Sequence, residues 1–251
     1  MVAAPAADAV DPGFELRYLD ARGLECGEVA ASWPGLRPEG FPPVREFRWA
    51  RGQRHMPGLW WSATTGGHVG YESWLERDHL MLLDFDPAVV AISTQPFWLC
   101  WRDDAGRSRR HAPDAFARLV DGTGVVIDVR PDDRIEPRDA EAFEATRQAC
   151  ELAGWRFRRV GAVDPVRTAN VAWLSRYRHR RCGSPDVAEL LVKEFAEPAP
   201  LLAGAEAVGD PLAVLPVLFH LLWCHRLAAD LTVRLTAATA VSLASGPGGA
   251  G

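Results

Sequence analysis

Lysine is almost absent from this 251-residue sequence: Lys193 is the single lysine, and all other Lys/Arg positions are arginines. Together with abundant alanine, glycine and proline, this bias indicates a gene from a GC-rich genome. The net charge at pH 7 is −5, so no overall positive field marks the chain as a nucleic-acid-binding protein. The length is sufficient to bury a full hydrophobic core, in one large domain or two small ones.

Cysteines and long apolar runs are also scarce. The five cysteines include no C-x-x-C pair, which argues against a disulfide framework or a zinc site and favours a reducing cytoplasm. The N-terminus lacks a basic region followed by an apolar core, so we expect no signal peptide. The longest apolar run, 212–224, is interrupted by Pro216 and His220 and is too short to cross a bilayer. We therefore expect a cytoplasmic protein without a membrane segment, with a disordered tail at 1–13 and a flexible one at 245–251.

The most informative stretch, 111–131, predicts a β-hairpin. Its segments 115–120 and 125–129 are short, apolar and rich in β-branched residues. The Asp-Gly-Thr-Gly sequence between them is typical of a turn, so the two segments are expected to pair as neighbouring strands.

Charged side chains gather at the open end of this hairpin. Asp114 stands at the start of the first strand, and Asp128 and Arg130 lie two residues apart on one face of the second. Two carboxylates and a guanidinium that converge in this way suit a hard divalent cation such as Mg2+, or Mn2+ in its place. Such a cation could polarise a phosphate and position a water molecule. The alternative is that these charges are only solvated at the mouth of a hairpin.

A second acidic pair lies on a predicted helix. The segment 71–85 has apolar residues at helical spacing, with glycines before it and Asp-Pro after it. Glu72 and Glu76 lie four residues apart and point along one side of this helix. Two like charges there indicate that a cationic group lies nearby. The alternative is that both face water, with Arg77 or another arginine as an ion-pair partner.

The remaining patterns complete an α/β protein. Strands are expected at 14–19, 89–92, 95–101 and 155–160, helices at 140–153, 170–177, 185–196 and 211–225, and two short strands that could pair at 227–231 and 239–243. In the first of these helices we expect Phe143, Ala149 and Leu152 to face inward, with Gly154 ending the helix. This order of elements predicts a sheet flanked by helices.

Two stretches are rich in arginine. At 45–54, spaced arginines beside aromatic residues could contact a DNA backbone, or form a solvated face over a small hydrophobic strip. At 176–181 a basic run ends the predicted helix 170–177.

The order Pro113-Asp114 … Asp128-Val129-Arg130 resembles the P-D…(D/E)-x-K signature of restriction-endonuclease-like nucleases. Taken with the acidic helix and the strands between, the order of motifs over roughly residues 55–180 resembles TnsA, the endonuclease subunit of heteromeric transposases. The resemblance implies a restriction-endonuclease-like mixed sheet flanked by helices. It also implies Mg2+-dependent cutting of one strand at each transposon end. An integrase-type transposase subunit (TnsB-like) would cut the other strand, and an AAA+ regulator (TnsC-like) would be a further partner.

The resemblance also assigns roles to individual residues. The metal-binding glutamate of the family falls on Glu76, with Glu72 as the less favoured alternative, and its metal-binding aspartate falls on Asp114. The polar residue two before the family lysine falls on Asp128, and the lysine itself on Arg130. Arginine can hold phosphate charge through two parallel donors, but it is never neutral and so cannot act as a base.

Two secondary candidates are His111 and Gln95, and either could equally be a hydrogen-bonded structural residue.

The expected organisation is a nuclease domain at 14–182 and a small helical domain at 183–244, for which a winged helix is one option. The family uses that last region to dock its partners; the alternative is that it only packs on the sheet. Two other functions remain open: a defence or repair nuclease of the same fold, and a non-catalytic DNA-binding or assembly subunit.

Overall fold

The computed structural model describes residues 13–45, 56–103 and 105–244. The chain forms two compact units, each built from two stretches of sequence. The first contains Met1–Gln53 and Ala91–Gly161, and the second contains Arg54–Val90 and Ala162–Gly251. The expected tails (apart from Gly13) and most of the first arginine-rich stretch, 46–54, lie outside the described residues. No described helix is both long and apolar enough to cross a membrane.

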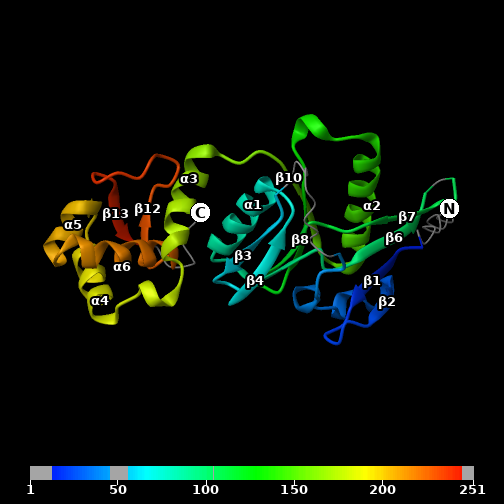
Figure 1. Ribbon diagram of the computed structural model, residues 1–251, viewed down its shortest axis with the longest axis horizontal. Coiled ribbons are helices and arrows are strands. Elements are labelled where there is room, and N and C mark those ends of the chain that lie inside the picture. The colour runs from blue at the N-terminus through cyan, green and yellow to red at the C-terminus, as the bar shows by residue number, and fades with distance from the viewer. Residues whose placement is uncertain (1–12, 46–55, 104, 245–251) are drawn as a thin grey trace, which may run out of the picture. The chain divides into compact units, whose positions relative to one another are not determined.

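Two four-stranded sheets form the first unit (Figure 1). One has the order β2-β1-β6-β7, with the strands β1 (Glu15–Leu19), β2 (Glu25–Val29), β6 (Trp98–Arg102) and β7 (Ser108–His111). The other has the order β10-β9-β8-β5, with the strands β5 (Val89–Thr94), β8 (Ala115–Leu119), β9 (Gly124–Val129) and β10 (Arg156–Val160). The first two residues of β5 are assigned to the second unit and the rest of the strand to the first. The predicted hairpin is confirmed, because β8 and β9 pair antiparallel. The predicted strand at 95–101 begins later, at Trp98.

Two glycines shape the hairpin. Gly122 has a φ of 86°, the left-handed backbone that its tight turn requires. Gly124 opens β9 where two rings close over the backbone: a Cβ there would lie 2.8 Å from atoms of both Phe116 and Trp155. These rings belong to the core of the unit, together with Leu16, Trp33, Phe97, Leu99 and Val126. The turn is therefore set by local sequence, whereas the core that closes over the hairpin brings together residues from Leu16 to Trp155.

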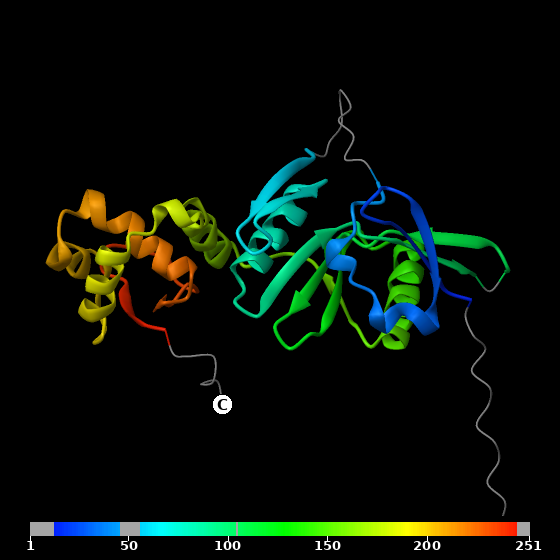
Figure 2. The same cartoon turned by 90° about the horizontal axis from the view of Figure 1, so that it is seen from below.

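Helix α2 (Pro137–Ala153) joins β9 to its parallel neighbour β10, as parallel strands need a crossover connection. It packs on β10 and on the 3-10 turn η1 (Ala30–Gly35), which lies beside it in Figure 2. Gly154 ends the helix in a left-handed conformation, as expected. The expected inward position of Leu152 is wrong, since its side chain is 48% exposed. The buried stripe is made of small residues at 145, 149 and 153, one helical turn apart, which lets the helix lie close to the sheet.

The second unit contains a β-hairpin and five helices within its described residues. The hairpin is β3 (Gly58–Ser62) with β4 (Gly67–Tyr71), and the helices are α1 (Trp74–Phe85), α3 (Pro165–Leu174), α4 (Pro185–Glu194), α5 (Leu201–Val208) and α6 (Pro211–Trp223). A small sheet has the order β11-β13-β12, formed by β11 (Ala199–Pro200), β12 (Leu227–Ala229) and β13 (Ala240–Leu243). The expected pairing of the last two strands is confirmed. The sequence patterns missed β3, β4, β11 and α5.

A buried carboxylate holds the hairpin of the second unit to α1. Asp84 accepts hydrogen bonds from Trp60 Nε1 at 3.0 Å and Ser62 Oγ at 2.8 Å. The backbone N–H groups of Ala63 and Thr64 donate to the same carboxylate, at 3.1 Å and 2.8 Å. With four donors the charge of Asp84 is satisfied without water, so this acidic residue has a structural role.

The predicted helix 71–85 starts three residues late, at Trp74. Tyr71 is the last residue of β4 and Ser73 is the N-cap of the helix, which explains the difference. Glu72 therefore precedes α1 and does not share a helical face with Glu76.

Candidate active site

Asp114 connects three segments of the first unit. Its carboxylate oxygen Oδ2 accepts a hydrogen bond of 2.7 Å from the backbone N–H of Val129, at the end of β9. Its backbone carbonyl accepts one of 3.2 Å from the N–H of Gln95. The side chain of Asp114 is half-buried, so the carboxylate is fixed in place and still reached by solvent.

Asp128 makes a close contact with His111. The Nε2 atom of His111 lies 2.9 Å and 3.0 Å from the two carboxylate oxygens of Asp128. The Asp128 side chain is 2% exposed and that of His111 is 22% exposed. An ionised carboxylate only accepts hydrogen bonds, so the geometry assigns the proton to Nε2 of the imidazole. Phe143 meets the His111 ring edge-on, with 6.5 Å between centroids, and helps to set its orientation.

The thiol of Cys150, which lies near Asp128, is unreactive. Burial raises the pKa of Cys150, and the neighbouring Asp128 carboxylate raises it further. This cysteine therefore stays protonated and is neither a nucleophile nor a metal ligand at neutral pH. All five cysteines are free thiols, as the sequence predicted.

Arg130 has a partner on α2. Its backbone N–H donates to the carbonyl of Val160 at 2.8 Å, which continues the pairing of β9 with β10. Its guanidinium Nη2 lies 3.4 Å from Asp139 Oδ1, and the side chain is 44% exposed. A contact this long and this exposed to water is weak, so the guanidinium can turn to another anion at small cost.

Gln95 has an unusual backbone and an unsatisfied amide. Its φ is +46°, a left-handed value that is uncommon for a residue with a side chain. The side chain is buried, and its Oε1 accepts a hydrogen bond of 3.2 Å from Arg45 Nε. Its Nε2 has no hydrogen-bond partner in the part of the chain that the structure describes. Backbone strain of this kind is common beside functional sites, and here the strained residue contacts Asp114 directly.

Glu76 and Glu72 belong to the second unit. Glu76 and Ser73 bond reciprocally at the start of α1: Ser73 Oγ accepts from Glu76 N–H at 3.2 Å and donates to Glu76 Oε1 at 2.8 Å. Glu76 Oε2 accepts a hydrogen bond of 2.7 Å from the N–H of Glu72. This is a variant of the capping box, and the Ser-x-x-Glu pattern that signals it is visible in the sequence. The hydrogen bonds of Glu76 therefore give it a structural role at the start of α1, beside the metal-binding role that the family resemblance implies.

Metal binding at these residues stays a prediction. Among the described residues, no three histidine, cysteine, aspartate or glutamate side chains are arranged to hold a metal ion. Mg2+ usually keeps several waters and takes only one or two carboxylates, so the half-buried Asp114 has the right donor chemistry. Asp128 has the same chemistry, but its carboxylate is buried against His111.

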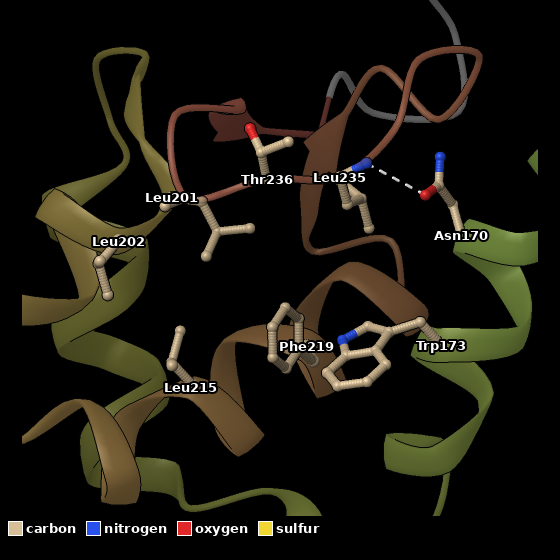
Figure 3. Close-up of a pocket in the computed structure, with 9 residues that line it drawn as sticks. Asn170, Trp173, Leu201, Leu202, Leu215, Phe219, Leu235 and Thr236 are labelled. Atoms are coloured by element: carbon tan, nitrogen blue, oxygen red, sulfur yellow. Dashed lines mark hydrogen bonds between the residues drawn. The ribbon is translucent and has the colours of Figure 1, made fainter. Parts of the chain in front are cut away.

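The second unit contains a cavity of about 420 Å3 (Figure 3). It is lined mainly by apolar side chains, including Trp173, Leu201, Leu202, Leu215, Phe219 and Leu235. Asn170 reaches it from α3, but its Nδ2 donates to the carbonyls of Leu231 and Val233, and its Oδ1 accepts from Leu235 N–H. These bonds hold the loop before β13, so the cavity offers apolar surface rather than catalytic groups.

The mixed sheet with its β9-α2-β10 crossover and acidic hairpin end places this protein among the α/β proteins of restriction-endonuclease-like type. Residues 86–160 match the family model described as TnsA-like endonuclease N terminal. The matched segment runs from the end of α1 to the end of β10 and contains Gln95, His111, Asp114, Asp128 and Arg130, whereas Glu72 and Glu76 precede it. No curated protein matches the chain. The chain thus carries a TnsA-like endonuclease segment, and the expected resemblance is confirmed over these residues.

Proposed function

We propose that this protein is the Mg2+-dependent DNA endonuclease subunit of a heteromeric transposase and cuts one strand at each transposon end. The observation that carries the proposal is that the TnsA-like match contains the hairpin end with Asp114, Asp128 and Arg130. A nuclease needs oxygen ligands for a metal and a cation for the phosphate, and these three residues supply both.

Each side chain has a distinct part in this proposal. Bound Mg2+, or Mn2+, would supply a Lewis acid for the phosphate and lower the pKa of a water. Asp114, held by the N–H of Val129, presents a fixed oxygen ligand. Arg130 leaves its weak contact with Asp139 and pairs with the phosphate through two parallel donors.

Asp128, His111 and Glu76 complete the proposed site. Asp128 fixes the orientation of His111, and becomes a ligand itself only if that contact opens. Glu76, with Glu72 as the alternative, remains the glutamate ligand predicted from the family pattern.

The proposed partners are transposon-end DNA, an integrase-type (TnsB-like) subunit and an AAA+ (TnsC-like) regulator. The second unit ends in helix, strand, two helices and two strands (α4, β11, α5, α6, β12, β13), an order that supports a winged-helix-like domain. The helix α6 has the sequence PLAVLPVLFHLLW, which lacks the arginine, asparagine and glutamine side chains that read bases. This favours protein docking for the domain, and the apolar cavity beside α6 would receive an apolar side chain of the regulator.

A specific observation favours a second candidate function. Arginine stands where the family has its lysine, and the carboxylate of Asp128 is buried against His111. Both features suit a subunit that has lost cleavage and retains DNA binding or assembly. A defence or repair nuclease of the same fold is a further alternative, and genes for an integrase-type transposase and an AAA+ ATPase next to this one would argue against it.

Nicking of a transposon-end duplex tests the proposal. The complete chain is combined with its integrase-type and AAA+ partners and Mg2+, and the cut strand is identified on a sequencing gel. We expect a nick on one strand at each end with the wild type and none with Asp114→Asn. If Asp114→Asn nicks as fast as the wild type, Asp114 is not part of the active site. If the wild-type complex assembles but does not nick, the non-catalytic alternative is established.

A further inference from the structure

The segment 176–181, which we call the basic segment, lies in the most positive stretch of an otherwise acidic chain. Between Asp164 and Asp186 the sequence has five arginines and no aspartate or glutamate, although the whole chain has a net charge of −5. Such a local excess of positive charge is the usual signature of a surface that meets a polyanion.

One arginine of the basic segment is turned inward and fixes its backbone. Arg178 Nε donates to the carbonyl of Trp61 at 2.9 Å, and the guanidinium lies 4.3 Å from the ring centroid of Trp60. The ring of His179 packs on Trp61, with 5.0 Å between centroids. His220 Nδ1 lies 2.7 Å from the carbonyl oxygen of Tyr177. All of these contacts are within the second unit, so the segment is an ordered platform.

The other three arginines of the segment face solvent. Arg176, Arg180 and Arg181 are exposed, and none of them forms an ion pair with a carboxylate in the described part of the chain. Arg176 is held over the ring of Trp173 at 4.9 Å, which limits the freedom that it would lose on binding an anion. Three unpaired guanidiniums on one fixed segment form a ready site for several phosphates.

The aromatic residues around the segment decide which polyanion fits. Single-stranded nucleic acid needs open rings for base stacking, but Trp61 is covered by His179 and Arg178, and Trp173 by Arg176. Trp173 is 42% exposed, but Phe219 packs edge-on against its ring at 5.9 Å and the charged Arg176 lies over it, which disfavours insertion of this ring into lipid. Contacts to the phosphate backbone of duplex DNA need positively charged side chains, but they need neither rings that stack on bases nor side chains that insert into lipid.

We propose that the basic segment binds the phosphate backbone of duplex DNA through Arg176, Arg180 and Arg181. This proposal rests on the proposed function, because it is the nuclease segment that makes DNA the expected polyanion. The contact would be independent of sequence and would add affinity while leaving the choice of the cut site to other parts of the complex.

Fluorescence anisotropy with a labelled DNA duplex, without divalent cations, tests the proposal independently of cleavage. The complete chain is titrated at several NaCl concentrations, as wild type and as Arg180→Gln/Arg181→Gln. We expect affinity at low salt to fall at least about tenfold, and the slope of log K against log salt to shrink by about 2, since each phosphate contact contributes about 0.9. Circular dichroism verifies that the variant is folded.

The matched control is Arg22→Gln/Arg138→Gln, which removes the same two charges from exposed positions of the first unit. Equal losses in both double variants would overturn the proposal, because the effect would then reflect net charge alone. An unchanged slope in Arg180→Gln/Arg181→Gln would overturn it as well. The proposal would also be overturned if Arg180→Gln/Arg181→Gln lost binding to vesicles of equimolar phosphatidylserine and phosphatidylcholine but kept its binding to DNA. If the segment binds DNA but the complete complex does not nick, the proposal stands and the endonuclease function fails.

Discussion

A single atom of His111, Nε2, lies within 3.0 Å of both carboxylate oxygens of Asp128. The two residues are 17 positions apart in sequence and lie on β7 and β9, which belong to different sheets of the first unit. Because Asp128 is almost completely buried, its charge depends on this contact for compensation. The pair therefore joins the two sheets next to the hairpin end on which the proposed chemistry depends.

Removing the imidazole should destabilise the protein. His111→Ala leaves a buried carboxylate without its donor, and we expect the free energy of unfolding to fall by about 1–3 kcal/mol. Urea denaturation followed by circular dichroism measures it. His68→Ala is the control, since His68 is exposed on β4 and the change should have little effect. In a double-mutant cycle, Asp128→Ala should lower the free energy of unfolding less in the His111→Ala background than in the wild type. If the two losses were strictly additive, the residues would not interact directly.

Substitution of Asp114 separates its charge from its structural bond. Asp114→Asn keeps an oxygen that can accept from Val129 N–H, so the melting temperature should stay close to that of the wild type. The same change removes the charge that a metal ligand needs, and nicking should be lost. Asp114→Ala should in addition lose about 0.5–1.5 kcal/mol of stability with the hydrogen bond. A folded Asp114→Asn variant that nicks normally would show that Asp114 serves only to hold β9.

The capping bonds of Glu76 allow a similar separation. Glutamine is compatible with a capping box, so Glu76→Gln should melt like the wild type, whereas Glu76→Ala should lose about 1 kcal/mol. If Glu76 is also the ligand, Glu76→Gln should abolish nicking and Glu72→Gln should lose far less. Normal nicking by Glu76→Gln would mean that its role is to cap α1, and the reverse ranking would make Glu72 the ligand.

The parts of the fold that were predictable depend on local chemistry. The β8-β9 hairpin was predicted because the turn at Asp121-Gly122 and the apolar strands on either side are neighbours in the sequence. Gly154 marked the end of α2 for the same reason. In contrast, the glycines at 66–67 suggest the boundary of a helix in the sequence, although Gly66 lies in the turn of the β3-β4 hairpin and Gly67 is the first residue of β4.

The parts that were missed depend on contacts between distant residues. His111 and Asp128 gave no sequence signal of their pairing, because the path of the chain through two sheets decides it. The role of Asp84 likewise appears only when the turn after β3 folds onto α1. Glu76 is the exception: its capping partner Ser73 stands three residues before it, so the structural role could have been inferred beside the catalytic one.

Arg130 is the position at which this chain departs from the family pattern, and its role can be tested directly. If its guanidinium holds phosphate charge, Arg130→Lys should keep measurable nicking, and Arg130→Ala should lose roughly 10²–10³-fold, the effect of removing one charge-stabilising donor. The pH–rate profile should show no ionisation of this side chain, since guanidinium stays charged.

Asp139→Asn provides a control for the Arg130 series. Asparagine can still accept from Glu136 N–H at the start of α2, but it removes the ion pair with Arg130. Because that pair is long and exposed, nicking should be unchanged or slightly faster. Nicking that is unaffected in Arg130→Ala would make Arg130 a structural residue. An inactive wild type that gains activity as Arg130→Lys would instead identify a nuclease that lost its chemistry through this one substitution and kept its place in the complex.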